Sequence, residues 1–440
     1  MVYRIGLEEQ SGTFFGVVVD KRDSVIFKTS GRNVEEVIKK ISVTVQGSPE
    51  SVDYIGISTD AINRAFSNLT IFPPIALIRI GASNNNFSYK SENYNFRSRK
   101  EPVIHTFFVR GMINLTGEDD IPLDISKVRD ICEFLNDNKK IKAIGILGLF
   151  SNFFPRHEER VARELRKICK RKVPICLSSD ISHRSLVYRE GFLVSNLKLL
   201  SRISPHLIRL SDKIRPYIGN ADIFLLKFDG SLIPSKLAVN YPVLLRDATQ
   251  VSKIVGATTS TKIKNIYMLT QVYSKVGAMS TNESRPIVKR VWDSLRIESD
   301  SFTYSVSRLL NDNSSGIYAM LENIHKNGKS TIIMDKRLLG RFPKVERLGI
   351  FPMQLDGYLG ALGAATAPIR STTDFLGSIQ FQGRKEVLER VKNVAEEKIV
   401  EKGASVSSIK VVQVDEIPVS YLPWDTLRIR ITLEGKPGKT

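Results

Sequence analysis

Residues 141–177 read IKAIGILGLFSNFFPRHEERVARELRKICKRKVPICL, and this stretch decides the fold class. Residues 141–150 are almost wholly apolar, as a parallel strand buried on both faces should be. Pro155 then opens a pattern typical of an amphipathic helix, which we expect to run to Arg171. The next apolar run lies at residues 173–177. Strand, helix and strand in this order predict a β-α-β crossover, and therefore an α/β protein with parallel strands.

The N-terminal part of the chain predicts a meander followed by a helix and a strand. Short β-rich runs lie at residues 3–7, 13–20 and 25–28, each bounded by polar or glycine-containing turns. A helix with one apolar face begins near Asn33, whose side chain is suited to cap it. A further strand is expected at residues 52–58. This order is that of the opening half-domain of an actin-like protein.

The remainder of the chain predicts a second α/β half and a smaller α+β segment. Residues 83–100 are polar, basic and rich in asparagine, which favours a loop. Further elements are expected as helices at residues 185–215, 314–327 and 385–402, and as strands at residues 221–228, 262–269, 331–334, 408–414 and 426–433. We predict an N-terminal lobe at residues 1–220, a second, shortened lobe at 221–370 and a small C-terminal segment at 371–440.

Composition describes an ordinary soluble globular protein of 440 residues, 42% hydrophobic and 25% charged. No run approaches the roughly 20 apolar residues of a membrane-spanning helix, and the N-terminus leads directly into a strand. We therefore expect a cytoplasmic protein without a membrane partner. The formal charge of +19 favours anionic ligands or an acidic partner. Nucleic acid is not expected, because no nucleic-acid-binding motif accompanies the charge.

The cysteines and histidines point to no metal or redox chemistry. Cys132, Cys169 and Cys176 form no C-x-x-C pair, so we predict free thiols and neither a disulfide framework nor a zinc site. The five histidines never pair at metal-ligand spacing, and no Ser-His-Asp or Cys-His arrangement can be argued from their neighbours. No metal ligands are assigned.

One stretch closely resembles a known family. The run Gly-Leu-Phe-Ser-Asn-Phe-Phe-Pro-Arg-His-Glu-Glu-Arg-Val-Ala at residues 148–162, followed by Leu-Ser-Ser at 177–179, is similar to the hydantoinase A / 5-oxoprolinase family. That family shows a strand, an Asn-Pro-x-His-Glu helix start and a Leu-Ser-Ser strand end there. Residues 228–232 and 356–363 are similar to its Ser-Asp-Gly-Gly and Pro-Gly-x-x-Ser-Ala-Leu-Gly segments. The matching stretches fall in the family's order over roughly residues 1 to 370.

The resemblance implies a two-lobed actin-like (ribonuclease H-like) ATPase fold, with a nucleotide held by two glycine-rich hairpins and a metal-orienting Asp. Members of the family open cyclic imides or lactams such as hydantoin and 5-oxoproline, some with ATP, or carboxylate ketones. They usually work beside a second subunit. ATP and Mg²⁺ as cofactors, hydrolysis of cyclic amide C–N bonds, and a hydantoinase B-like partner or a homo-oligomer are what the resemblance implies for this chain.

The nucleotide loops depart from the family pattern. A phosphate loop needs glycines, because backbone N–H groups must approach the phosphate closely, and it needs a carboxylate to position Mg²⁺. The first loop is represented by residues 9–16, which keep Gly12 and Thr13 but lack both aspartates; Glu9 is the candidate replacement. The second, at residues 269–276, has neither glycine nor carboxylate. We predict degenerate loops and a pseudoenzyme.

The remaining candidate site residues are weighed against simpler roles. Ligand binding is assigned to Gly12, Thr13, Ser58, Thr59, Asn63, Asp229 and Gly230, and catalysis to Glu9 and Asp20. Ser, Thr and Asn also cap helices, and Asp-Gly is a common turn. His157 and Glu158 lie in the first turn of a helix, where a carboxylate complements the helix dipole, so a structural role is favoured for both.

Three functions remain open at this point. The first is a non-catalytic or weakened subunit that keeps the actin-like scaffold. The second is an active hydrolase of a small cyclic amide with a re-equipped cleft, using Glu8, Glu9 or Asp20 with Thr13 and Ser58. The third is a basic protein that binds anions or nucleic acid. An open cleft lined by carboxylates would favour the second, and a cleft filled by Phe14, Phe15 and Tyr273 would disfavour it.

Overall fold

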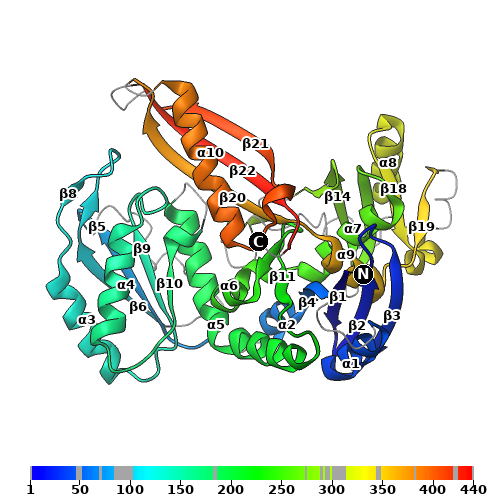
Figure 1. Cartoon of the computed structure of the whole chain (residues 1–440), viewed down its shortest axis with the longest axis horizontal. Helices are drawn as coiled ribbons and strands as arrows, with labels where there is room; N and C mark the ends of the chain where they lie inside the picture. The colour runs from blue at the N-terminus through cyan, green and yellow to red at the C-terminus, as the bar shows by residue number, and fades with distance from the viewer. Residues whose placement is uncertain are drawn as a thin grey trace.

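The computed structural model describes most of the chain. The described residues are 2–45, 52–68, 72–83, 103–181, 186–272, 275–287, 291–292, 298–299, 314–342, 348–380, 383–419 and 425–438. The predicted loop at residues 83–100 therefore lies outside the described residues, except for Ser83. Tyr273 also lies outside them. Figure 1 shows the N-terminal strands at one end, a separate parallel sheet at the other, and the C-terminal strands and helix above the middle.

The first lobe is built on a sheet that begins with the predicted meander. Strands β1 (Tyr3–Gln10), β2 (Thr13–Val19) and β3 (Val25–Gly31) are antiparallel neighbours. Strand β4 (Val52–Thr59) pairs with β1 in parallel, and β11 (Asp222–Leu226) pairs with β4 in parallel. The spatial order is β3-β2-β1-β4-β11.

Helix α1 (Val34–Thr44) begins where the sequence predicts. The Asn33 side chain accepts a hydrogen bond of 2.7 Å from the Glu36 backbone N–H, which satisfies one of the free donors at the helix start. Val37, Ile38 and Ile41 are buried between the helix and the sheet. The predicted cap and apolar face are both confirmed.

The second lobe repeats the topology of the first. Its five-stranded sheet has the order β15-β14-β13-β18-β19. The strands are β13 (Ile266–Val272), β14 (Lys275–Asn282), β15 (Arg285–Pro286), β18 (Thr331–Asp335) and β19 (Phe351–Met353). As in the first lobe, three antiparallel strands are followed by two parallel ones. Two sheets with one shared order form the two-lobed actin-like arrangement that was predicted.

Two helices connect the lobes and pack against each other. Helix α7 (Ala248–Thr261) leads into the second sheet, and α9 (Gly357–Thr366) returns to the first. A Cβ at Gly256 would collide with the Leu359 carbonyl oxygen, and one at Gly6 would collide with the Ala361 carbonyl oxygen. Helix α9 is therefore held closely between α7 and strand β1, which fixes the carboxyl end of β1 beside both helices.

A separate four-stranded sheet is inserted between β4 and β11. Its order is β10-β9-β5-β6, with β5 (Ile75–Gly81), β6 (Ile104–Arg110), β9 (Ile144–Gly148) and β10 (Ile175–Leu177) all parallel. Helix α4 (Arg156–Ile168) links β9 to β10. The β-α-β crossover predicted from residues 141–177 is confirmed.

One prediction about the cysteines was wrong. Cys132 on α3 (Ile125–Asp137) and Cys169 at the end of α4 form a disulfide. Cys176 is a buried free thiol, as expected, and burial raises its pKa to about 12. Spacing along the chain gave no sign of the disulfide, because the tertiary packing of the two helices brings these cysteines together.

The C-terminal strands extend the first sheet. Strands β20 (Ile369–Ser378), β22 (Thr426–Gly435) and β21 (Lys410–Pro418) are antiparallel neighbours, and helix α10 (Arg384–Glu401) packs on β20 and β22. They join β11 through β12 (Leu232–Pro234) by the pair Leu232 and Ile369, which completes a nine-stranded sheet. The predicted helix and strands are confirmed here. The division at residues 220 and 370 stays a prediction.

The other elements include one long helix, α5 (Leu186–Ile214). The rest are α2 (Ala61–Asn68), α6 (Ser235–Asn240), α8 (Ser314–Asn327), β7 (Met112–Ile113), β8 (Asp119–Ile121), β16 (Val291–Trp292), β17 (Glu298–Ser299) and the 3-10 segments at residues 178–180, 215–217, 242–245, 336–341 and 406–408. Within the described residues, no helix combines the length and apolar character needed to cross a bilayer.

Candidate functional site

The candidate site lies where strands β1 and β4 end. Because parallel strands place their carboxyl ends at one edge of a sheet, Glu8 and Glu9 of β1 lie beside Ser58 and Thr59 of β4. Helix α2 starts directly after β4 and brings Asp60 to the same edge. Most of the residues assigned from the sequence are thus gathered here.

The first hairpin has a two-residue turn. Gln10 pairs with Thr13, and both turn residues have positive φ, 51° at Ser11 and 81° at Gly12. This is the backbone of a tight hairpin turn, and it explains the glycine. The backbone N–H of Ser11 donates to Asp60 Oδ2 at 2.8 Å. A donor at the tip of the hairpin is therefore already occupied by a carboxylate.

Glu9 is the centre of a polar cluster on one face of the sheet. Its side chain is almost fully buried. Oε2 accepts from Thr59 Oγ1 at 2.6 Å and lies 2.9 Å from His206 Nε2, while Oε1 pairs with Arg64. Burial opposes ionisation, but these contacts outweigh it and hold the pKa of Glu9 below its usual value. The carboxylate is ionised and both of its oxygens are engaged.

Glu8 lies on the opposite face, because side chains alternate along a strand. It is fully buried, and its Oε1 lies 3.8 Å from Lys253 Nζ on helix α7. Lys253 also donates to Gln10 Oε1 at 3.2 Å. The carboxyl group rests against Gly360, where a Cβ would overlap it. Burial raises the pKa of Glu8 to about 8 in spite of Lys253.

Asn63 connects this edge to the start of helix α7. Its Nδ2 donates to Asp247 Oδ1 at 2.9 Å, and its Oδ1 accepts from the Asp247 backbone N–H at 3.2 Å. Asp247 has a left-handed backbone with φ 55°. Ser58 Oγ is buried without a hydrogen bond among the described residues. Both predicted residues lie at the edge, with Asn63 engaged as a structural link.

Asp20, Asp229 and Gly230 lie elsewhere. Asp20 follows the far end of β2, where its side chain accepts from the backbone N–H groups of Arg22 and Ser24 at 2.8 and 2.9 Å. Asp229 and Gly230 form the predicted turn between β11 and β12, with φ 78° at Gly230. The structure therefore separates these three residues from Glu9 and Gly12.

The residues that carry the family resemblance form a second buried network. Glu158 accepts from Gly148 N, Ser151 Oγ and Ser178 Oγ, each at 2.6 Å. Arg189 of α5 is buried beside them and donates to Ser178 Oγ at 2.7 Å. These contacts tie the ends of β9 and β10 to α4 and α5, in line with the structural role that we favoured for Glu158.

Several residues of the edge had no sequence signal. Lys253 and His206 lie inside ordinary helical sequence, and only the fold brings them to Glu8 and Glu9. Asp60 and Arg64 could have been detected, since they follow the Ser-Thr pair and lie four residues apart, the spacing of an ion pair on a helix. In the structure they form this ion pair, at 2.8 Å. Among the described residues, no group of three or more His, Cys, Asp or Glu is arranged to hold a metal.

Comparisons with known proteins agree with this fold. A structure of nucleotide-free acetone carboxylase matches with a TM-score of 0.65 and 11% identity, over 99% of this chain and 88% of that chain. An ATP-dependent caprolactamase from Pseudomonas jessenii matches with a TM-score of 0.66 and 10% identity, over 98% of this chain and 87% of that chain. At such identities the likeness shows a shared fold. No curated protein sequence gives a significant match.

The fold and these likenesses place the chain in the class of two-lobed proteins with the actin-like ATPase fold, as predicted. Residues 11–169 match the family model of the hydantoinase/oxoprolinase N-terminal region. The chain carries this family's N-terminal region, and the resemblance inferred from its sequence is confirmed.

Proposed function

We propose that this chain is a hydantoinase/oxoprolinase-family subunit, related to ATP-dependent enzymes of cyclic amides and ketones, whose own catalytic activity is lost or much weakened. The observation that carries the proposal is the state of Glu9. Thr59, His206 and Arg64 engage both of its carboxylate oxygens. Glu9 thus offers no free oxygen to a magnesium ion or a reacting group.

The described residues of the first hairpin also fit a nucleotide poorly. A triphosphate needs free backbone donors and a surplus of positive charge. The N–H of Ser11 donates to Asp60, so it has a negatively charged partner already. Lys253 lies against Glu8 and Gln10, and Arg64 pairs with Glu9 and Asp60. ATP and Mg²⁺ therefore have no catalytic part in the proposed function.

A role as a subunit is supported by the outer strand of the nine-stranded sheet. Strand β21 ends the sheet order within the described chain, so one of its edges has no strand partner there. Val411, Val414 and Ile417 on this strand are 46%, 44% and 41% exposed. An exposed edge with apolar side chains is suited to pairing with another protein. The partner that we propose is a hydantoinase B-like or otherwise acidic subunit, or a second copy of the chain.

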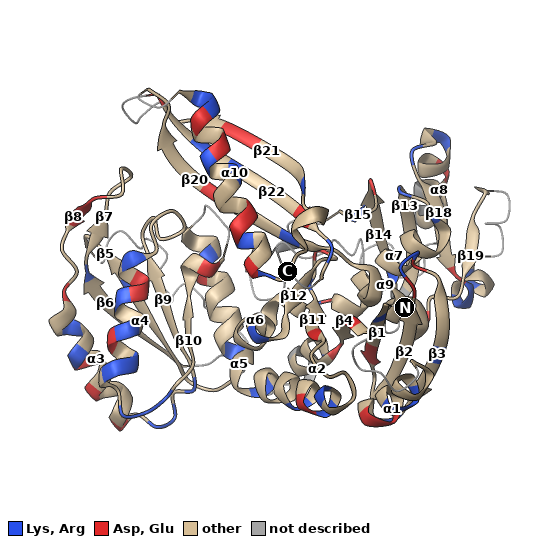
Figure 2. Ribbon diagram, viewed as in Figure 1, with Lys and Arg blue, Asp and Glu red and all other residues tan. Residues whose placement is uncertain are grey.

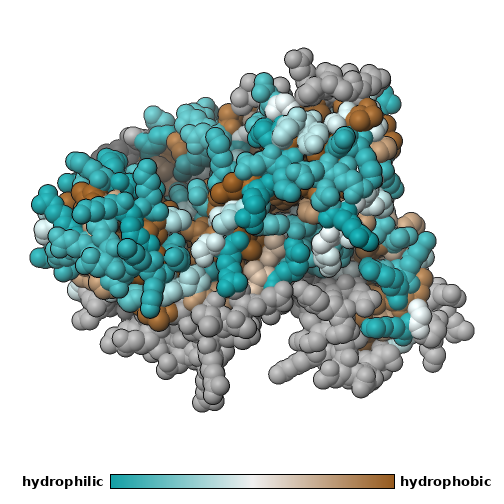
Figure 3. Space-filling view, turned by 90° about the horizontal axis from the view of Figure 1, so that it is seen from below, coloured by the Kyte–Doolittle hydropathy of each residue, from teal (hydrophilic) through white to brown (hydrophobic). Residues whose placement is uncertain are grey.

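The distribution of charge gives less support to nucleic-acid binding. Figure 2 shows acidic and basic residues interspersed along α1, α4 and α10. The face in Figure 3 is mostly hydrophilic where it is coloured, with apolar residues scattered over it. On α1, α4 and α10, the basic residues lie among acidic ones in Figure 2.

The test is hydrolysis of ATP by the purified chain, with and without hydantoin or 5-oxoproline. We expect no turnover above the rate without protein, both for the wild type and for Glu9→Ala. The exposed Glu389 provides the matched control Glu389→Ala. Robust ATP-dependent ring opening that disappears in Glu9→Ala but persists in Glu389→Ala would refute the proposal.

One observation favours the second candidate, an active hydrolase with a re-equipped cleft. The His206 side chain is 30% exposed and lies 2.9 Å from Glu9 Oε2, which is the geometry of a histidine held by a carboxylate. If this pair acts on a cyclic amide, ring opening should proceed without ATP and be abolished in His206→Gln. The absence of ATP-independent ring opening in the wild type would exclude this candidate.

A further inference from the structure

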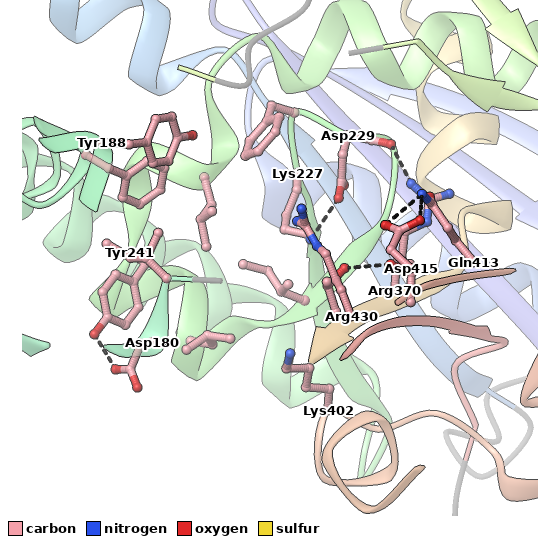
Figure 4. Close-up of a pocket in the computed structure, with 18 residues that line it drawn as sticks. Asp180, Tyr188, Lys227, Asp229, Tyr241, Arg370, Lys402, Gln413, Asp415 and Arg430 are labelled. Atoms are coloured by element: carbon pink, nitrogen blue, oxygen red, sulfur yellow. Dashed lines mark hydrogen bonds and ion pairs between the residues drawn. The ribbon is translucent and has the colours of Figure 1, made fainter. Parts of the chain in front are cut away.

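A cavity of about 490 Å³ lies away from the carboxyl ends of β1 and β4. One wall comes from Asp180 and Ile181 together with the start of α5, a second from the turn between β11 and β12 together with α6, and a third from β20, β21 and β22. Figure 4 shows Tyr188, Tyr241 and Asp180 on one side, Lys227, Arg370 and Arg430 on the other, and Lys402 below. The cavity therefore joins an aromatic wall to a cationic one.

The charged side chains of the cavity carry a small excess of positive charge. Four of the described lining residues are cationic and three are acidic, a net charge of plus one. The cations are Lys227, Arg370, Lys402 and Arg430, and the acids are Asp180, Asp229 and Asp415.

The three acids are already engaged. Asp229 accepts from Lys227 at 3.0 Å and from Ser231 Oγ at 2.7 Å. Asp415 accepts from Gln413 at 2.9 Å. Asp180 accepts from the hydroxyl group of Tyr241. None of these carboxylates has Lys402 or Arg430 as a hydrogen-bond partner.

Two cations are left for a ligand. The Arg430 side chain makes no hydrogen bond or ion pair with any described residue, and Lys402 Nζ donates to the neutral Ser371 Oγ at 2.8 Å. Arg370 differs, since Glu434 accepts from it at 2.9 Å. A guanidinium and an ammonium group that line one cavity attract an anion.

We propose that this cavity binds a small carboxylic acid with an apolar body, its carboxylate between Arg430 and Lys402 and its body against Phe192 and Leu237. The net charge of plus one matches a monovalent carboxylate. The apolar wall gives the ligand's body a surface to bury, as in other sites for small molecules. The proposal does not depend on the nucleotide cleft, so its test is independent of the proposed function.

The state of Lys402 makes the binding depend on pH. Burial, followed by the nearby charges of Lys227 and Lys398, lowers the pKa of Lys402 to about 8, while Asp180 and Asp229 act in the opposite direction. As pH rises through this value the ammonium loses its proton and one of the two ligand contacts loses its charge. Affinity for a carboxylate should fall over that range.

The test is calorimetric titration of the full chain with benzoate, hexanoate and the neutral isostere benzamide. We expect saturable binding of the two acids and none of benzamide. Arg430→Leu and Lys402→Met should each weaken benzoate by about tenfold or more, because each removes one charge-assisted hydrogen bond. Lys385→Gln, an exposed change on α10 outside the cavity, should leave binding unchanged.

A second arm uses Lys402→Arg, which keeps its charge at high pH. Between about pH 7 and about pH 9, the wild type should lose affinity for benzoate while Lys402→Arg keeps it. Thermal unfolding checks that each variant folds. If Lys402→Met does not fold, binding by Arg430→Leu still tests the proposal. The proposal is overturned if neither acid binds saturably, if benzamide binds as well as benzoate, or if Arg430→Leu binds benzoate like the wild type.

Discussion

Glu8 makes the stability of this protein depend on pH in a way that one substitution should remove. Its carboxyl group is fully buried between β1, Gly360 of α9 and Lys253 of α7, and its pKa is raised from 4.5 to about 8. Between those values the unfolded chain has lost the proton while the folded protein keeps it. Glu8→Gln has nearly the same shape and no proton to lose.

The sign and size of the effect follow from the two pKa values. The contribution of Glu8 to stability is fully present below pH 4.5 and is lost as the pH rises through about 8. Each pH unit in this window lowers the free energy of unfolding by about 1.4 kcal/mol. From about pH 5 to about pH 8 the wild type should therefore lose on the order of 4 kcal/mol relative to Glu8→Gln.

The assay is urea unfolding of wild type, Glu8→Gln and the exposed control Glu389→Gln at several pH values, because only the difference between variants isolates Glu8. We expect the difference in the free energy of unfolding between wild type and Glu8→Gln to change steadily with pH. The same difference between wild type and Glu389→Gln should not change with pH. A constant difference for Glu8→Gln would refute the reasoning, since it would mean that Glu8 is ionised throughout beside Lys253.

Two further substitutions test the packing and the polar network. Gly6→Ala places a Cβ against the backbone carbonyl of Ala361, so it should lower the free energy of unfolding in urea melts by about 3 kcal/mol. A loss below about 1 kcal/mol would mean that α9 can move away from β1. Glu158→Ala leaves Arg189 buried without its carboxylate and should cost about 3 to 5 kcal/mol of unfolding free energy, whereas the exposed Glu389→Ala should change nothing measurable; equal melts for these two variants would contradict the network.

Local signals in the sequence predicted most of the secondary structure. Asn33 indicated a helix start because its side chain can cap only the N–H groups that follow it, and the Asp229-Gly230 pair indicated a turn for a similarly local reason. The apolar run at residues 141–150 identified a buried parallel strand. Family resemblance then supplied the order of the lobes, which local patterns do not contain.

The contacts that decide the candidate site were not predictable in the same way. Lys253 reaches Glu8 only because α7 and α9 cross at glycines, and His206 reaches Glu9 from the middle of a long helix. The same is true of the cavity beside Asp229, whose cationic wall comes from strands far along the chain. Such contacts depend on tertiary packing, and neither residue spacing nor composition specifies them.

The most direct test of the central proposal is calorimetric titration of the purified chain with ATP and Mg²⁺. Because Glu9 and the N–H of Ser11 have partners within the protein, we predict no saturable heat of binding. Clear saturable binding would contradict the proposal of a lost or weakened site, and it would show that these contacts open to admit the nucleotide.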